Sequence, residues 1–461
     1  MSKSEIMLGA AVRRIGRWIV RFYYPKIEFD GRDQLPKTGP VLVCGNHPNS
    51  LVDPILIGIT SGRPVRFMAK APLFKTPVLG AVMSGLGMIP TYRGSDDSKQ
   101  VRRNLESLDS SIQFLIDGDA VGIFPEGKTH DLVQLEMVRS GVARIAVKAV
   151  EEGAENLMVV PVGLNYAHKE RFRSGVSVQV GRPIKVKEWL ENSQEEGRKA
   201  IRALTNEVAT RLKSVIVHLE EPNWEPLLDD FVALTKPESQ VCPMVLRKRI
   251  ADAMNYFVLE DRPRAEEIAK SVRAHGSEVS ECKLSLDSLV LQSQGKGLVG
   301  RAIFRFGISL LGLIPAVIGL VFHLVPFLIV RFVAARVTPP GRTAVSLYRL
   351  LVGMPVYAAW YTGFVFWLWW VGSLWPTGTL AVLVLPFLGM LAISYCPLLL
   401  KAVPNASSQL SILLQKSKHN SLRLHQRELR GILVEMEAEY VDHSSSEMSV
   451  FHVSNDANSV K

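Results

Sequence analysis

Residues 45–53 hold a histidine and an aspartate whose types and spacing suit proton transfer. They read Gly-Asn-His-Pro-Asn-Ser-Leu-Val-Asp and directly follow the apolar run 41–44. That run is typical of a buried parallel strand, and chemistry in an open α/β sheet usually takes place where strands end. His47 could act as a general base, with Asp53 orienting its ring. Hydrogen bonding to the loop backbone is the alternative for such a pair taken alone.

Three further motifs follow in order, each at the expected end of a strand. Residues 87–94 read Gly-Met-Ile-Pro-Thr-Tyr-Arg-Gly, and residues 124–131 read Phe-Pro-Glu-Gly-Lys-Thr-His-Asp, with Ser-Gly-Val-Ala-Arg at 140–144. Residues 159–163 read Val-Val-Pro-Val-Gly. Together with the first motif, this ordered set resembles the glycerolipid acyltransferase superfamily, which contains glycerol-3-phosphate and 1-acylglycerol-3-phosphate acyltransferases. The resemblance covers about residues 38–185.

The resemblance implies that His47 and Asp53 are the catalytic pair. Five residues separate them, one more than the commonest spacing of the superfamily. This spacing, and the His-Asp ending of the third motif, are similar to the fungal-type glycerol-3-phosphate and dihydroxyacetone-phosphate acyltransferase branch. Acyl transfer from a thioester needs no enzyme nucleophile when a base deprotonates the acceptor alcohol. We expect no cofactor and no metal.

A phosphorylated acceptor needs cationic and backbone donors. Arg93 and Lys128 are the candidate cations. Gly94 and Gly127 would allow backbone N–H groups to approach a phosphate closely. Glu126 is a further candidate for substrate binding, with holding of its loop by hydrogen bonds as the alternative.

Other reactive residues have structural explanations that we favour. Cys44 lies three residues before His47 but stands within an apolar run, which indicates a buried strand residue rather than a nucleophile. Asp131 is expected to begin a helix rather than to form a second dyad. His323 lies in an apolar segment, where a functional role competes with a hydrogen bond between packed helices.

The elements that must position these residues alternate between strand and helix patterns over residues 38–217. This alternation predicts an α/β domain with a glycerol-phosphate-acyltransferase-like fold over residues 31–217. Residues 1–30 are expected to form an amphipathic helix that lies in the membrane interface or packs on its own domain. Helices are expected at about 97–117 and around 142–149, and strands at 41–44, 65–68, 87–91, 121–124, 157–164 and 176–180.

Composition indicates a membrane protein. The 461 residues carry a net charge of +10 and no nucleic-acid-binding motif, so anionic lipid or an anionic substrate explains the charge better than nucleic acid. Mean hydropathy is +0.15, and the apolar residues concentrate in segments 306–330, 350–371 and 379–400, each about long enough to span a bilayer. The four scattered cysteines suggest a reducing compartment and neither a disulfide framework nor a metal site.

The distribution of basic residues predicts the membrane topology. All flanks of the apolar segments are basic except 372–378, which is uncharged. The positive-inside rule then makes 350–400 a hairpin and 306–330 a bent, re-entrant segment, with three full spans as the alternative. We assign residues 218–300 to a helical insertion or linker and 301–402 to the membrane region. Residues 403–461 would form a cytoplasmic helix and a disordered tail. The tail is expected from about residue 443, where the sequence is rich in Ser, Asn and Asp and lacks an apolar period.

We therefore expect an integral membrane protein whose catalytic domain faces the cytoplasm. It would transfer a fatty acyl group from acyl-CoA or acyl carrier protein to glycerol-3-phosphate or dihydroxyacetone phosphate, in contact with membrane lipid. One alternative is a 1-acylglycerol-3-phosphate acyltransferase. Another is a non-enzymatic protein that binds phospholipid headgroups, against which the intact His-Asp pair argues because a binder needs no base.

Overall fold

The structure is a computed structural model, and it describes residues 3–75, 77–92, 98–235, 243–282, 286, 298–338, 340–372, 378–395 and 416–456. The chain divides into two compact units. The first comprises Met1–His218 together with the separate segment Thr338–Tyr348, and the second comprises Leu219–Val337 and Arg349–Lys461. The first unit contains the residues expected to be catalytic.

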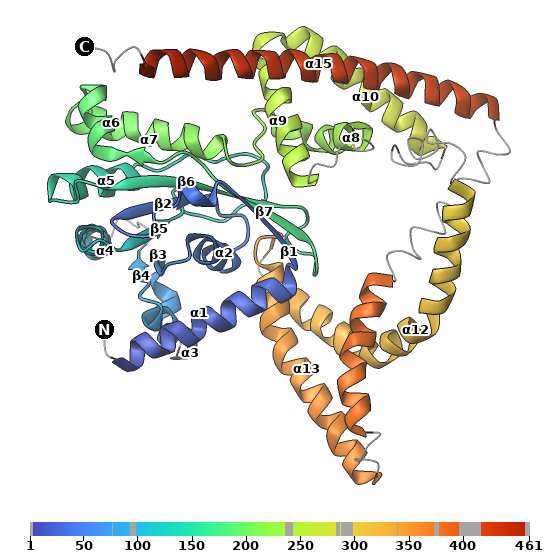
Figure 1. Cartoon of the computed structure of the whole chain (residues 1–461). Helices are drawn as coiled ribbons and strands as arrows, with labels where there is room; N and C mark the ends of the chain where they lie inside the picture. The colour runs from blue at the N-terminus through green and yellow to red at the C-terminus, as the bar shows by residue number, and fades with distance from the viewer. Residues whose placement is uncertain are drawn as a thin grey trace. The chain divides into compact units, whose positions relative to one another are not determined.

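An eight-stranded sheet forms the centre of the first unit (Figure 1). Its strands are β1 Lys26–Asp30, β2 Val41–Gly45, β3 Val65–Lys70, β4 Ile89–Thr91, β5 Ala120–Ile123, β6 Met158–Tyr166, β7 Gly175–Val180 and β8 Ile184–Lys185. Their order is β1-β7-β6-β2-β5-β3-β4, with β8 beside β6. Neighbouring strands are parallel, except that β6 runs antiparallel to β7 and β8. The carboxyl ends of β5, β2 and β6 therefore lie at one edge.

Helices cover both faces of this sheet. Helices α1 Lys3–Tyr23, α2 Val52–Ser61 and α3 Pro77–Gly85 lie on one side, and α5 Gly141–Glu151, α6 Val186–Ser193 and α7 Gly197–Lys213 lie on the other (Figure 1). The remaining long helix, α4 Ser98–Ile116, packs against α5. Short 3-10 turns occur at Arg32–Gln34 and Ala71–Lys75.

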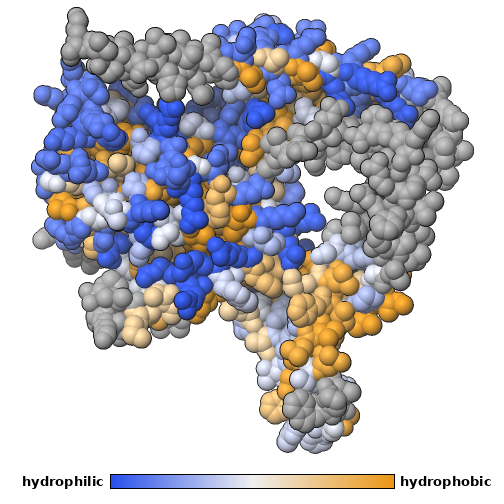
Figure 2. Space-filling view, viewed as in Figure 1, coloured by the Kyte–Doolittle hydropathy of each residue, from blue (hydrophilic) through white to orange (hydrophobic). Residues whose placement is uncertain are grey.

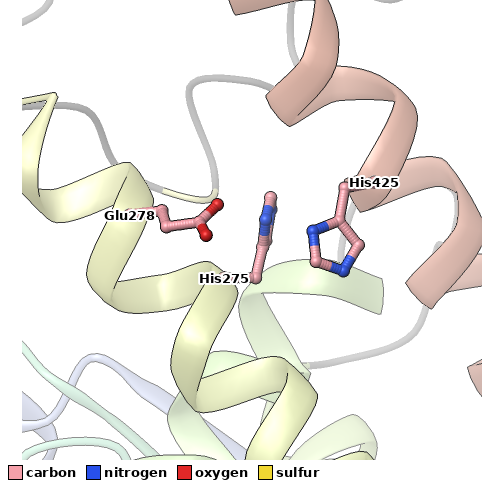
Figure 3. A group of neighbouring side chains, drawn as sticks. All are labelled: His275, Glu278 and His425. Carbon is pink, nitrogen blue, oxygen red and sulfur yellow. The ribbon is translucent and has the colours of Figure 1, made fainter. Parts of the chain in front are cut away.

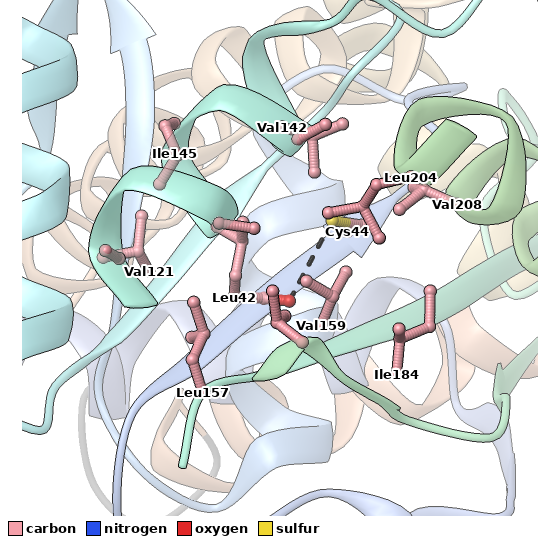
Figure 4. Packing of buried hydrophobic residues seen from close by; sticks show 14 of the residues in the cluster. Leu42, Cys44, Val121, Val142, Ile145, Leu157, Val159, Ile184, Leu204 and Val208 are labelled. Atoms are coloured by element: carbon pink, nitrogen blue, oxygen red, sulfur yellow. Dashed lines mark hydrogen bonds between the residues drawn. The ribbon is translucent and has the colours of Figure 1, made fainter. Parts of the chain in front are cut away.

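The core lies between the sheet and the α5–α7 layer. Leu42 and Cys44 of β2 pack with Val121 of β5, Val159 of β6 and Ile145 of α5 (Figure 4). Every residue of β2 is buried, which explains its continuous apolar sequence, because a central parallel strand is covered on both faces. Burial raises the pKa of the Cys44 thiol. The expectation that Cys44 is a buried strand residue is confirmed.

The α/β fold class and the strand–helix alternation are confirmed, with element ends shifted by a few residues. The amino-terminal helix differs more: we expected it to reach residue 30, but it ends at Tyr23, and Lys26–Asp30 joins the sheet beside β7. These five residues alternate between exposed and half-buried positions. Such a pattern is typical of an edge strand, and its brevity makes it easy to miss in sequence.

The second unit is helical over the residues that the structure describes. Residues 218–300 contain helices, as expected, and so does the apolar region. The bounds are α8 Glu225–Thr235, α9 Pro243–Glu260, α10 Arg262–Glu281, α12 Leu298–Val337, α13 Val345–Trp370, a helix at Thr379–Tyr395 and α15 Lys416–Asp456, with a 3-10 turn at Pro222–Trp224. The first residues of α13, through Tyr348, belong to the first unit.

Two helical stretches, Gly312–Val337 and Val345–Trp370, are long and apolar enough to cross a membrane. Their surface is largely apolar where Figure 2 shows it. The third apolar segment forms the shorter helix Thr379–Tyr395; residues 373–377 and 396–400 lie outside the described residues. Helix α12 contains Pro315 and Pro326 and bends along its length (Figure 1).

His323 of α12 has a structural environment. One ring nitrogen, Nδ1, lies 2.7 Å from the carbonyl oxygen of Gly319 in the preceding turn, and Nε2 lies 2.8 Å from the hydroxyl of Tyr361 on α13. Both polar atoms of the ring are thus satisfied between packed helices, which favours the packing explanation over a functional one.

The carboxyl-terminal residues differ from expectation. A disordered tail was expected from residue 443, but α15 continues to Asp456. Neither glycine nor proline occurs between residues 432 and 456, so the sequence contains no residue that forces the helix to end. Disorder was inferred because apolar residues do not recur at helical spacing in this stretch. Such spacing predicts which face of a helix packs against the protein, and its absence does not prevent the helix from forming.

Candidate active site

His47 and Asp53 form a hydrogen-bonded pair at the carboxyl end of β2. His47 stands in the loop after the strand, and Asp53 stands in the first turn of α2. His47 Nδ1 lies 2.9 Å from Asp53 Oδ2, and the side chain of Asp53 is completely buried while that of His47 is 20% exposed. The histidine therefore faces the surface and the carboxylate supports it from behind.

Further donors fix the Asp53 carboxylate. The backbone N–H of Asn49 donates to Oδ2 over 2.6 Å, and the hydroxyl of Tyr166, at the end of β6, donates to Oδ1 over 2.6 Å. Burial and the neighbouring charge of Asp53 raise the pKa of Tyr166 well above its ordinary value, so the phenol remains a donor. With the carboxylate held, His47 keeps its hydrogen on Nδ1 and presents the Nε2 lone pair outward.

Asn49 connects the pair to a buried network that sequence reasoning missed. Its Nδ2 donates to the Tyr24 hydroxyl over 2.8 Å, and its Oδ1 accepts a hydrogen bond from Ser346 Oγ over 2.6 Å. Asn49, Tyr24 and Ser346 are all inaccessible to solvent. The Tyr24 hydroxyl also contacts the carbonyl oxygen of Lys169. No local pattern identifies these partners, although Asn49 stands inside the first motif.

Two contacts orient the loop and the imidazole. The side-chain amide of Asn46 pairs with the backbone of Leu164 in β6, donating over 3.1 Å and accepting over 2.7 Å. The ring of His47 stacks on Phe124, with 4.0 Å between centroids and 9° between planes. In the loop between His47 and Asp53, Ser50 adopts a left-handed backbone conformation with φ of 43°. This conformation turns the loop, which is one residue longer than the commonest spacing of the superfamily, back toward α2.

Glu126 is buried and both its oxygens are engaged. Oε1 accepts the backbone N–H of His47 over 3.2 Å, whereas Oε2 accepts the backbone N–H of Glu136 over 3.1 Å and also contacts His130 Nε2. The hydrogen bond with Glu126 raises the pKa of His130, against the opposing effect of burial. These contacts tie the third motif to the histidine loop. A direct contact of Glu126 with substrate stays a prediction.

Cationic residues gather after β5, the parallel neighbour of β2. Lys128 is half exposed and pairs with Glu136 at 2.8 Å. Gly127 has φ of 74°, and its N–H donates to the Phe124 carbonyl oxygen over 3.0 Å. A Cβ at Gly127 would stand 3.0 Å from Nε of Arg139, a cation that sequence reasoning did not select. Arg93 and Gly94 lie outside the described residues.

The expectation for Asp131 is wrong. It does not begin a helix: the next helix starts at Gly141. Asp131 instead forms an ion pair with Lys169 at 2.6 Å and accepts the backbone N–H of Arg342 over 2.9 Å. Burial alone would raise the pKa of Asp131, but these donors lower it. Lys169 and Arg342 are both distant from Asp131 in the sequence. The residues next to Asp131, which resemble the start of a helix, therefore led to a wrong prediction.

The arrangement suits base-assisted attack by an alcohol. A partly exposed imidazole has one nitrogen directed outward, and its other nitrogen is held by a buried carboxylate. Positive side chains and a glycine turn follow the adjacent parallel strand, where an anionic group could bind. The predicted pair is thus brought together, with cations at the same edge of the sheet.

Known acyltransferases are similar to part of this chain. Residues 26–165 match a family model described as Acyltransferase. Glycerol-3-phosphate O-acyltransferase 1 of Saccharomyces cerevisiae is 25% identical over 190 residues, which cover 40% of this chain and 25% of the yeast protein. The 1-acyl-sn-glycerol-3-phosphate acyltransferase of Borreliella burgdorferi is 27% identical over 179 residues, 38% of this chain and 66% of that protein. The matches therefore span less than two thirds of each relative.

One solved structure is similar over part of the chain. The crystal structure of the 1-acyl-sn-glycerophosphate acyltransferase from Thermotoga maritima is 21% identical and superposes with a TM-score of 0.33. The match covers 44% of this chain and 77% of the Thermotoga chain.

Proposed function

We propose that this chain, which carries an acyltransferase domain over residues 26–165, transfers a fatty acyl group from an acyl thioester to the hydroxyl of glycerol-3-phosphate or dihydroxyacetone phosphate. The observation that carries the proposal is the pair of His47 and Asp53, 2.9 Å apart at the carboxyl end of a central parallel strand. The donor would be acyl-CoA or acyl carrier protein.

The reaction proceeds by direct attack. His47 Nε2 accepts the proton of the acceptor hydroxyl while the oxygen attacks the thioester carbonyl carbon. The tetrahedral intermediate collapses with cleavage of the carbon–sulfur bond, and the thiolate leaves as a thiol by taking the proton from His47. Asp53 stabilises the transient imidazolium without taking its proton. The buried, inert Cys44 is not needed as an acyl carrier.

The same edge of the sheet would bind the acceptor phosphate. Lys128 and Arg139 are the described cations near Gly127, and Arg93 and Gly94 are proposed from sequence alone. Lys128 would exchange its ion pair with Glu136 for the phosphate. Because that pair is half exposed, the exchange costs little. Glu126 would act mainly by holding the His47 backbone.

Membrane association is part of the proposal. The two long apolar helices are one reason for it, and α1 is another. Helix α1 packs on its own domain through Gly16 and Val20. It leaves Ile15, Trp18 and Phe22 between 43% and 68% exposed. These three side chains lie on one stripe of the helix and could enter the membrane interface, where tryptophan is favoured. Packing and membrane contact, the two alternatives from the sequence, would then both apply, on different faces of this helix.

The segment Thr338–Tyr348 supports the hairpin topology. It belongs to the first unit, which contains His47. Ser346 donates a hydrogen bond to Asn49, and the backbone N–H of Arg342 donates one to Asp131. Residues on both sides of 306–330 would therefore lie on the side of the membrane where His47 works. The bent α12 is compatible with a re-entrant path, and cytoplasmic acyl donors would place this side in the cytoplasm.

The experiment is a parallel assay of the purified full-length protein with three acceptors. Glycerol-3-phosphate, dihydroxyacetone phosphate and a 1-acylglycerol-3-phosphate are each supplied with labelled acyl-CoA and, separately, with acyl carrier protein. The proposal expects one of the first two to give the highest kcat/KM. Preference for the third would identify a 1-acylglycerol-3-phosphate acyltransferase, which the Borreliella relative makes the second candidate.

A second arm distinguishes an enzyme from a lipid-binding protein. Without acceptor, labelled acyl-CoA should leave the protein unlabelled, because no acyl-enzyme forms. Labelled product that appears with wild type and disappears with His47→Ala supports catalysis. Vesicle binding without any product would instead indicate a non-enzymatic phospholipid binder.

A further inference from the structure

We propose that the second unit holds a divalent transition-metal ion, zinc by its ligand chemistry, between α10 and α15. The ligands are His275 and Glu278 of α10 and His425 of α15, whose coordinating atoms all lie within 4.8 Å of one another. Figure 3 shows the three side chains turned toward one another, with His275 between the other two. The sequence alone predicted no metal, and this site lies outside residues 26–165, which match the acyltransferase model. The proposal is independent of the function proposed above.

The spacing of the two α10 residues suits metal binding. His275 and Glu278 are three residues apart, so they project from the same face of the helix. A carboxylate and a histidine at this spacing supply metal sites in helical bundles. His425 comes from a helix that packs against α10. Two imidazoles and one carboxylate are a zinc ligand set that leaves the fourth tetrahedral position to water.

The hydrogen bonds around His275 leave the lone pair of its Nδ1 atom available to a metal ion. Gln426 is buried, and its Nε2 donates to the carbonyl oxygen of Leu286 over 3.2 Å, so its Oε1 faces His275 Nε2 at 3.5 Å. An amide oxygen accepts hydrogen bonds only, which places the histidine hydrogen on Nε2. A second partner that fixes the tautomer in this way is usual for metal-bound histidines.

His275 Nδ1 is the nitrogen that would coordinate the metal ion. The residue is completely buried, and Nδ1 has no hydrogen-bond partner among the described residues. A buried acceptor without a donor costs free energy, which a bound cation removes.

Small side-chain rotations would complete the site. Zinc bonds of about 2.0–2.1 Å in a tetrahedron place ligand atoms roughly 3.3 Å apart, whereas the ligand atoms here lie within 4.8 Å of one another. Glu278 is exposed and His425 is partly exposed, so both can turn toward the fixed His275 without disturbing the core. The ion would then join two helices that are far apart in the sequence, and it would stabilise the folded unit because the unfolded chain holds no such site.

The test measures metal binding directly on the full-length protein. The protein is purified in detergent, stripped with a chelator and titrated with Zn²⁺ by equilibrium dialysis, and with Co²⁺ by its visible absorption. We expect one tightly bound ion per chain and the absorption of four-coordinate cobalt. Zinc should also raise the melting temperature of the stripped protein, since a ligand that binds only the folded state stabilises it.

Variants assign the ion to these residues. His425→Gln removes a ligand and should weaken zinc binding at least tenfold, since loss of a mere hydrogen-bond partner of a ligand already costs roughly ten- to a hundredfold. Exposed Glu278→Gln, which is not expected to affect folding, should weaken it too. The matched control is His443→Gln, a histidine on the same helix α15 outside the cluster, which should bind as wild type does. The proposal is overturned if the stripped protein binds no zinc, or if both ligand variants bind it unchanged. It is also overturned if the control loses as much affinity as they do.

Discussion

Ser346 donates a hydrogen bond to Asn49 over 2.6 Å, although the two residues are 297 positions apart in the sequence. Asn49 in turn donates its backbone N–H to Asp53, the partner of His47. The first turn of the apolar helix α13 thus helps to hold the pair that is proposed to be catalytic. Because both side chains are fully buried, water cannot replace the hydrogen bond if it is lost.

Ser346→Ala should impair both stability and catalysis. It leaves the Asn49 amide oxygen buried without this donor, at a cost of about 1–3 kcal/mol. We expect a lower melting temperature and a several-fold lower kcat, with little change in KM because Ser346 is proposed to touch no substrate. Thr343→Ala, a change in the same segment, is the control. A variant that matches wild type in both measurements would show that this contact does not position the pair.

His47→Ala should reduce kcat by roughly two to four orders of magnitude, the usual contribution of a general base. Asp53→Asn should also be severely impaired, because an amide can hold the imidazole in the wrong tautomer. Steady-state assays with the preferred acceptor measure both effects. His168→Ala, a change of an exposed histidine in the same unit, should be near normal; near-normal turnover of the His47 variant would refute the mechanism.

The contact between His130 and Glu126 predicts a pH dependence of stability. The hydrogen bond with Glu126 raises the pKa of His130 above its ordinary value of 6.5. A raised pKa in the folded state means that protonated His130 stabilises the fold fully below about pH 6.5, and that this contribution is lost as pH rises through the folded-state pKa.

The measurement is the melting temperature of wild type and His130→Gln across this range of pH. Glutamine can keep a neutral hydrogen bond but not the charge, so wild type should exceed the variant most at low pH. The difference should shrink as pH rises. His168→Gln provides the baseline for an exposed histidine, and a His130 difference that stays constant with pH would count against a charged pair.

Arg139→Ala should raise the KM for the phosphorylated acceptor, by roughly tenfold or more. A lost charge-assisted hydrogen bond costs about 1.5–3 kcal/mol, and each 1.4 kcal/mol corresponds to about a factor of ten. Arg93→Ala and Lys128→Ala should act in the same direction, whereas the KM for the acyl donor should change little. Arg198→Ala, which alters an exposed arginine of α7, is the control. Equal effects on both substrates would argue against phosphate binding.

The proposed topology can be tested with single cysteines in a background without the native ones. Pro340→Cys, Trp375→Cys and Leu410→Cys are treated in intact cells with a membrane-impermeant thiol reagent. Because the segment around 340 contacts the catalytic unit and both basic flanks favour the cytoplasm, only position 375 should react. Three full spans would instead expose positions 340 and 410.

The contact between His47 and Asp53 and the type of fold could be predicted from the sequence, while the catalytic role of the pair stays a prediction. His47 and Asp53 stand within seven residues, between a buried strand and the first turn of a helix, so their encounter depends only on local structure. The central strands were likewise evident, because a strand covered on both faces needs a continuous apolar run. The short edge strand β1 lacked this signal, since one side of it faces solvent.

Only the tertiary structure revealed what holds the pair in place. Tyr166 and Ser346 contact Asp53 and Asn49 from positions more than a hundred residues away, and a serine or tyrosine carries no pattern that identifies its partner. The same holds for Asp131, whose sequence suggests a helix cap while its charge is met by Lys169. Sequence spacing determines contacts within one turn or loop, whereas contacts between distant segments depend on how the whole sheet and its helices pack.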